Sequence, residues 1–207
     1  MKKLKNILFI VSTFLFLTAC NTTTIRSTQT SPGLITGAAT PEELLFDVGI
    51  NIFDPDITDK TTEEVNGYTK ILEAEANYMP FKLMETIQGS GNWGVVRVIP
   101  NKQSEMDIWV DGMIIKSDGA MLELDITLRD ASNSKWYSKR YKQEISKYAY
   151  DLNSNKSEPF QNLYDQIAND MLLYYRKLSP NQITNIRTIS QLQFAKRFSP
   201  EVFSDYI

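Results

Sequence analysis

The sequence of 207 residues contains no histidine. Histidine is the usual general base near neutral pH, the base that activates serine and cysteine nucleophiles, and the commonest transition-metal ligand. Its absence excludes the most frequent designs of hydrolytic and metal-dependent active sites. Catalysis would have to rely on carboxylates, lysine, tyrosine or serine, so the composition predicts a protein that is not an enzyme.

Cysteine and long hydrophobic runs are also scarce. The single cysteine, Cys20, leaves the chain without an internal disulfide. The main apolar run, residues 7–17, is roughly half as long as the about 20 residues that a membrane-spanning helix needs. Three lysines precede this run, and two small residues separate it from Cys20, which is the layout of a cleaved secretory signal.

The residues around Cys20 resemble the processing site of bacterial lipoproteins. In such proteins the peptide is cut before the cysteine, whose thiol and new amino group are acylated. We therefore predict that residues 1–19 are a signal peptide and that Cys20 is the lipidation site through which the protein is held on a membrane. Residue 21 is Asn rather than the Asp that often causes retention in the inner membrane. The resemblance thus favours the outer membrane, with the protein on its periplasmic face.

The expected mature chain is mildly acidic and has the composition of a globular protein. Removing residues 1–19 removes three lysines and no acids, which moves the formal net charge from −3 to −6. A protein of this charge has no general reason to bind nucleic acid. Residues 21–40 are rich in Thr, Ser and Gly, so we predict a flexible tether that, with the lipidated cysteine, spans residues 20–41. Residues 42–207 are enough for a single periplasmic α/β domain.

Alternating apolar residues and turn signals predict five strands, at residues 44–53, 95–99, 108–115, 121–129 and 135–143. Short turns around residues 117–119 and 130–133 join the last three strands, which makes them antiparallel neighbours. The fourth strand is predicted to bury one face, because its apolar side chains alternate with polar ones. These apolar residues are Leu122, Leu124, Ile126 and Leu128.

Helical spacing of apolar residues predicts a helix over residues 63–88 and another over residues 158–178, with Ser157 as the N-cap of the second. Pro80 predicts a kink or a restart in the first helix. Two shorter helical pieces are expected at residues 188–198 and from residue 200 onward. The order β-α-β-β-β-β-α with short C-terminal helices predicts an α+β fold. We expect a two-layer α/β sandwich in which helices cover one face of a mostly antiparallel sheet.

Three segments resemble a family of gammaproteobacterial envelope lipoproteins. They are residues 92–100 (NWGVVRVIP), 159–170 (PFQNLYDQIAND) and 194–200 (FAKRFSP). The order of elements is also similar, more loosely, to the small α/β domain of the curli-secretion lipoprotein and of the N-terminal part of TolB. Those domains bind protein partners in the envelope, so the resemblance implies an accessory role. It supplies no catalytic residues.

Two local motifs suggest ligands but lack the context that those ligands require. Residues 89–94 (GSGNWG) match the dinucleotide pattern G-x-G-x-x-G, yet they follow a predicted helix and precede a strand, which is the reverse of the required order. A glycine helix cap and a tight turn explain them. Residues 54–59 crowd acids as a calcium loop does, but Asp59 stands where Gly is needed and Val65 where Glu is needed. We therefore expect no cofactor and no metal.

A cluster of basic and aromatic residues on the last predicted strand is the candidate partner surface. Lys135, Tyr137, Lys139 and Tyr141 share one side of an alternating strand, and Trp136 is expected to anchor the other side inward. Tyrosine is frequent at protein interfaces, and lysine would steer an acidic partner. The alternative is an edge strand whose lysines discourage unwanted pairing.

Two functions follow as hypotheses. The first is a non-enzymatic accessory or scaffold component of an envelope assembly, anchored through the lipid on Cys20 and bound to an envelope protein partner. The alternative is a carboxylate-dependent envelope glycan hydrolase, which needs two acids about 5 to 9.5 Å apart in a cleft. Glu73 and Glu75 do not form such a pair, because residues two apart on a helix do not face each other.

Overall fold

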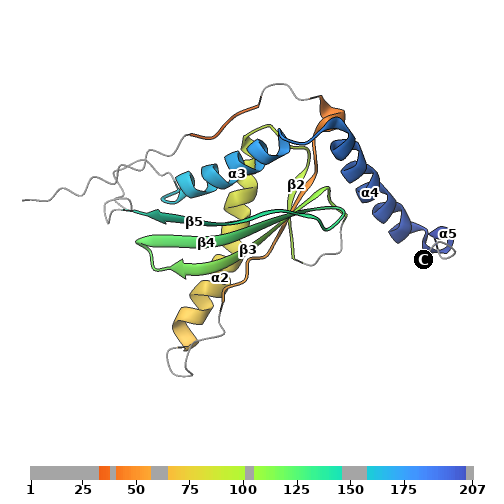
Figure 1. Cartoon of the computed structure of the whole chain (residues 1–207). Coiled ribbons are helices and arrows are strands. Elements are labelled where there is room, and N and C mark those ends of the chain that lie inside the picture. The colour runs from red at the N-terminus through yellow and green to blue at the C-terminus, as the bar shows by residue number, and fades with distance from the viewer. Residues whose placement is uncertain (1–32, 38–40, 57–64, 101–104, 146–157, 204–207) are drawn as a thin grey trace, which may run out of the picture.

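The computed structural model describes residues 33–37, 41–56, 65–100, 105–145 and 158–203 (Figure 1). The predicted signal peptide and Cys20 lie outside the described residues. Five strands form one sheet in the order β2-β1-β3-β4-β5. The strands are β1 (Val48–Asn51), β2 (Val96–Ile99), β3 (Ile108–Ser117), β4 (Met121–Asp130) and β5 (Lys135–Glu144). The helices are η1 (Glu42–Leu44), α2 (Val65–Gly89), α3 (Gln161–Tyr175), α4 (Pro180–Phe198) and α5 (Pro200–Phe203).

The sheet is mixed, and its long strands are antiparallel. β1 pairs in parallel with both β2 and β3, while β3, β4 and β5 form the predicted antiparallel meander. α2 passes behind the strands in Figure 1, and α3 packs against α2 and β5. The predicted α+β fold, a two-layer α/β sandwich, is confirmed. Within the described parts of the chain, no helix combines the length and the apolar character needed to cross a membrane.

The core lies between the sheet and these two helices. The four alternating apolar residues of β4 (Leu122, Leu124, Ile126 and Leu128) are fully buried, as their pattern predicts. The predicted stripe of α3 meets them from the opposite layer, with Leu163, Ile167 and Met171 all buried. The burial of these apolar side chains between the two layers is a large favourable contribution to folding.

Two predicted elements differ from the observed ones near the N-terminal half. The first strand is shorter than residues 44–53, because the chain first forms the single turn of η1, in which the Leu44 N–H donates to the carbonyl of Pro41. The first helix continues through Pro80 without a restart. Pro80 has no N–H for the carbonyl of Ala76. That carbonyl instead accepts a hydrogen bond from the Phe53 N–H (3.1 Å), so α2 keeps its backbone paired.

The C-terminal helices also differ from the prediction. α4 begins at Pro180, well before residue 188, because Ser179 and Gln182 form a reciprocal capping box with Pro180 in the first turn. α3 begins at Gln161 with Phe160 as its N-cap, and the predicted N-cap, Ser157, lies outside the described residues. In Figure 1, α4 runs past one end of the sheet toward the C-terminus.

Residues 33–37, which we call the N-terminal strap, belong to the folded domain although we expected them in the flexible tether. The side-chain oxygen of Asn169 on α3 accepts a hydrogen bond from the Ile35 N–H (2.7 Å), and its amide group donates to the carbonyl of Gly33 (3.2 Å). The amide of Asn92 donates to the carbonyl of Ile35 (2.7 Å). Both asparagines are buried, so these bonds fix the strap against the domain.

Candidate functional site

The structure corrects the orientation of the predicted partner surface on β5. Tyr137, Lys139 and Tyr141 stand in register with Leu128, Ile126 and Leu124, so they share the face that the helices cover. The Tyr141 side chain is only 2% exposed, and its hydroxyl donates to Asp170 of α3 (2.8 Å). The Lys139 ammonium contacts the same carboxylate (2.5 Å). The two tyrosine rings therefore lie between β5 and α3.

A β-bulge explains the arrangement of the aromatic residues on β5. The pairing with β4 shifts between Leu128 and Arg129, which leaves Trp136 as an extra residue on β5. Trp136 is buried, as predicted, and stacks on Tyr174 of α3 (ring centroids 4.7 Å apart), while Tyr137 lies 6.0 Å from the same ring. Burial raises the pKa of Tyr137 and of Tyr141 above the usual range.

The two ligand-like motifs are accounted for as far as the structure describes them. α2 ends at Gly89 and β2 begins at Val96, and Gly91 has a φ of +68°, so residues 89–94 form the predicted turn after a helix. The acidic loop continues into residues 57–64, which lie outside the described ones. Across the described ranges, no three or more acidic or cysteine side chains gather as metal ligands.

A different surface emerges where α4 passes the end of the sheet. We call it the α4 groove, a hollow of about 450 Å³. Its lining residues are Asp47, Val95, Arg97, Glu105, Met106, Phe194, Arg197 and Phe198. Phe194 and Phe198 pack against each other (centroids 4.5 Å apart) and yet remain 55% and 70% exposed. The sequence pattern did not predict this groove, although the Phe194–Phe198 spacing of four residues is that of one helix face.

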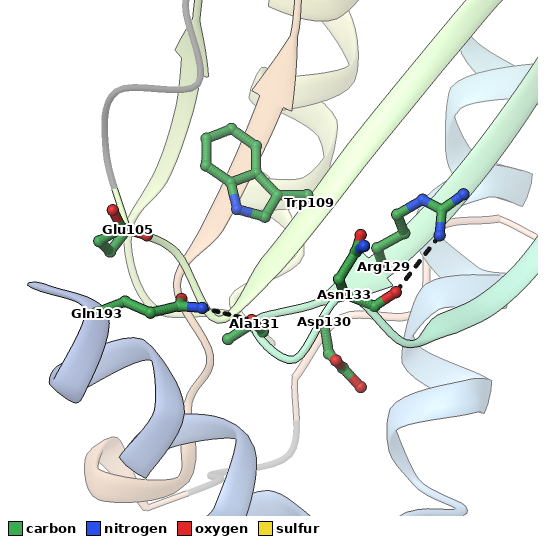
Figure 2. Close-up of a pocket in the computed structure, with 7 residues that line it drawn as sticks. All are labelled: Glu105, Trp109, Arg129, Asp130, Ala131, Asn133 and Gln193. Carbon is green, nitrogen blue, oxygen red and sulfur yellow. Dashed lines mark hydrogen bonds between the residues drawn. The ribbon is translucent and has the colours of Figure 1, made fainter. Parts of the chain in front are cut away.

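A second hollow, which we call the Trp109 pocket, adjoins the groove and shares Glu105 with it. It has a volume of about 190 Å³ and is lined by Glu105, Trp109, Arg129, Asp130, Ala131, Asn133 and Gln193. Figure 2 shows the indole of Trp109 between Glu105 and Arg129, with the indole nitrogen on the edge nearer to Gln193 and Ala131. The Gln193 amide donates to the carbonyl of Ala131 (2.9 Å), which ties α4 to the β4–β5 turn.

The two acids of the Trp109 pocket do not converge on one point. In Figure 2 the Asp130 carboxylate points away from Glu105. It is occupied by the turn itself, because it accepts hydrogen bonds from the N–H groups of Ser132 (2.9 Å) and Ser134 (3.1 Å) and from the Trp136 indole (3.2 Å). The Glu105 carboxylate lies 3.9 Å from the guanidinium of Arg197. This pair therefore gives no support to a glycan hydrolase.

Two further carboxylates are perturbed by burial. Desolvation raises the pKa of Asp107, which accepts a hydrogen bond from the Asp47 N–H (2.9 Å) and thereby fixes the start of β1. Desolvation also raises the pKa of Glu75 on α2. One Glu75 oxygen accepts from the Ser117 hydroxyl (2.9 Å), and the other is buried without a hydrogen-bond partner within the described part of the chain. Neither acid lines the Trp109 pocket or the α4 groove.

Comparisons with known proteins add little to this geometry. No family model matches the chain, and no curated protein matches it. Among solved structures, the chain is similar to a PelC variant, described as a dodecamer, from Paraburkholderia phytofirmans. The identity is 14% and the TM-score 0.35, and the match covers 72% of this chain and 92% of that chain. A likeness this weak does not assign a function.

Proposed function

We propose that the protein is a membrane-anchored periplasmic lipoprotein that acts as a non-enzymatic accessory or scaffold component of an envelope assembly. Cys20 would carry the lipid, on the periplasmic face of the outer membrane, and the α4 groove would bind a protein partner. The observation that carries this proposal is the exposed pair Phe194 and Phe198 at the edge of a hollow. Large exposed aromatic side chains around a hollow are typical of protein interfaces.

The charges of the groove indicate the chemistry of the partner. α4 contains three basic residues and no acid, and two of them, Lys196 and Arg197, lie in its last turn. Arg97 on β2 adds a further cation to the groove. The groove lining holds the cations Arg97 and Arg197 together with the acids Asp47 and Glu105. A partner segment with apolar side chains flanked by charges of both signs would complement the aromatic wall and this mixed rim.

The groove is preformed, because α4 is fastened to the domain at several points. Ile186 and Ser190 are buried against the body, and the Arg187 guanidinium donates to the carbonyl of Leu45 (2.8 Å). The Gln193 bond to Ala131 holds the next turn. A preformed groove loses less conformational entropy when a partner binds than a mobile segment would.

Acylation is tested by Cys20→Ser. The thiol is the proposed lipid acceptor, so this variant is expected to lose incorporation of a clickable fatty acid in metabolic labelling. Thr22→Ser, two residues away, should label as strongly as the unchanged chain. Equal labelling of Cys20→Ser would remove the lipoprotein assignment.

Partner binding is tested by placing a photo-crosslinking amino acid at position 198 in cells. We expect a discrete crosslinked protein, because Phe198 lines the α4 groove. The same probe at position 173 is the control, since Leu173 on α3 is 45% exposed but does not line the groove.

The double variant Phe194→Ala with Phe198→Ala is expected to prevent co-purification of the crosslinked protein while the thermal midpoint stays nearly unchanged, because both rings are exposed. Co-purification that survives the double variant, or crosslinking as strong at position 173, would place the partner surface elsewhere.

A further inference from the structure

The outer face of the sheet, opposite α2 and α3, carries a row of four residues in register across four strands. Arg97 on β2 pairs with Gly49 on β1, Gly49 with Trp109 on β3, and Trp109 with Arg129 on β4. With strands about 4.8 Å apart, this row is about 14 Å from end to end. An indole therefore lies between two guanidinium-bearing positions.

Gly49 leaves the space that the indole of Trp109 occupies. A Cβ at position 49 would lie 2.8 Å from Cζ3 of Trp109 and 2.9 Å from Cγ of Met106, closer than real side chains approach. The absence of a side chain lets the Trp109 ring lie over β1. The ring is thus supported from below by backbone, while Trp109 lines a hollow that opens to solvent.

The groups around the indole form a polar rim. The amides of Asn133 and Gln193, the guanidinium of Arg129 and the carboxylate of Glu105 all belong to residues that line the Trp109 pocket. Figure 2 shows them coming from α4, β4, the β4–β5 turn and the segment before β3. A flat aromatic ring with planar hydrogen-bonding groups at its edge suits a ring-shaped ligand rich in hydroxyl groups.

The described part of the chain shows no acid paired with the cations of the row. In the described ranges neither Arg97 nor Arg129 forms an ion pair; Arg129 donates only to the carbonyl of Asn133 (3.4 Å). Farther along the same face, by contrast, Arg140 is paired with Asp125 (2.7 Å). Of the two acids that line the pocket, Asp130 accepts hydrogen bonds from its own turn, and Glu105 lies 3.9 Å from Arg197. Guanidinium groups bind carboxylates through two parallel hydrogen bonds, so Arg129 and Arg97 favour an anionic ligand.

We propose that the Trp109 pocket and the row around it bind an acidic saccharide, with one sugar ring stacked on the indole and sugar carboxylates on Arg129 and Arg97. An acidic peptide fits less well. Peptides recognised by a sheet add a strand at its edge, whereas the indole lies over the interior strands β1 and β3. This binding site shares Arg97 and Glu105 with the proposed partner groove but extends beyond it and does not need Phe194 or Phe198.

The test is isothermal titration calorimetry of the whole chain in detergent with a tetramer of galacturonate. We expect binding that weakens as salt is raised, because the attraction between the sugar carboxylates and the guanidinium groups is screened. The same tetramer with its carboxylates methyl-esterified should bind at least tenfold more weakly. Trp109→Ala and Arg129→Gln should each weaken binding of the galacturonate tetramer at least tenfold, while Arg140→Gln, on the same face, should not change it.

Two variants keep the test decisive if Trp109→Ala does not fold. Trp109→Phe should retain most of the affinity, since a flat ring remains, and Gly49→Ala should lose it, since the indole is displaced. The double variant Phe194→Ala with Phe198→Ala should bind the tetramer normally, which separates this site from the α4 groove. No binding of the tetramer, equal binding of its ester, or stronger binding of tetraglutamate would each overturn the proposal.

Discussion

Replacing Leu124 by alanine is expected to lower the free energy of unfolding by about 2–5 kcal/mol, the usual cost of emptying a fully buried leucine site. Leu124 is 0% exposed in the middle of β4 and stands opposite Tyr141. Ile167→Ala on α3 should cost a similar amount, because Ile167 is also 0% exposed in the facing layer. Urea unfolding of the whole chain measures both.

The matched control for Leu124→Ala lies on the same strand. Thr127 points to the outer face, where its hydroxyl bonds that of Ser138 at an exposed position (2.9 Å). Thr127→Ala should change stability by no more than about 0.5 kcal/mol. A loss below that size for Leu124→Ala or Ile167→Ala would contradict the assignment of these residues to one shared core.

Gly112→Ala is expected to destabilise the fold by about 1–3 kcal/mol through overpacking. A Cβ at position 112 would lie 2.5 Å from two ring atoms of Phe53, which is itself only 1% exposed and has little room to move. Gly89→Ala is the control, because a Cβ there meets nothing within 4 Å. Both variants are compared by chemical denaturation.

The Gly112 prediction can also be tested by coupling. If the clash with Phe53 is the cause, Phe53→Leu should relieve part of it, so that the double variant loses less stability than the two single losses together. Strictly additive losses would show that the destabilisation of Gly112→Ala arises from something other than the Phe53 ring.

The parts of the fold that depend on local periodicity were predictable. The alternation of β4 placed four side chains in the core, and the stripe of α3 placed Leu163, Ile167 and Met171 against them. The start of α4 was not predicted, although Ser179, Pro180 and Gln182 are a capping box in the sequence. The polar first half of α4 hid this signal, because it carries little apolar periodicity.

The face of β5 was not predictable from alternation. Tyr137, Lys139 and Tyr141 share one side of the strand as predicted. Lys135 does not, because beyond the bulge it pairs with Arg129 of the outer face. Both sides of this strand carry aromatic and basic residues, so the pattern does not say which side is buried. The bulge at Trp136 then turns Trp136 and Tyr137 toward the same helix. Bulges depend on pairing with the neighbouring strand, which a single-strand pattern does not contain.

The candidate sites depend on pairings between distant segments. Arg97, Gly49, Trp109 and Arg129 form a row only because β1 lies between β2 and β3 in parallel register. Turn lengths predict hairpins, but they do not fix the order of strands joined by a long crossover. Likewise, Phe194 becomes part of a groove only because α4 returns to the β4–β5 turn.

The N-terminal strap decides where mechanical tension would enter the fold. If Cys20 carries the proposed lipid, a pull on that lipid would reach Gly33 first, which accepts a hydrogen bond from Asn169, and then Ile35, which is bonded to Asn92 and Asn169. An extended segment peels away one hydrogen bond after another, at lower force than is needed to shear a paired strand. The hydrogen bonds of the strap would therefore break before those of β1. The released five residues would lengthen the tether by about 17 Å at full extension. Detachment of the strap would then allow the proposed membrane anchor and the domain to move apart while the sheet stays folded.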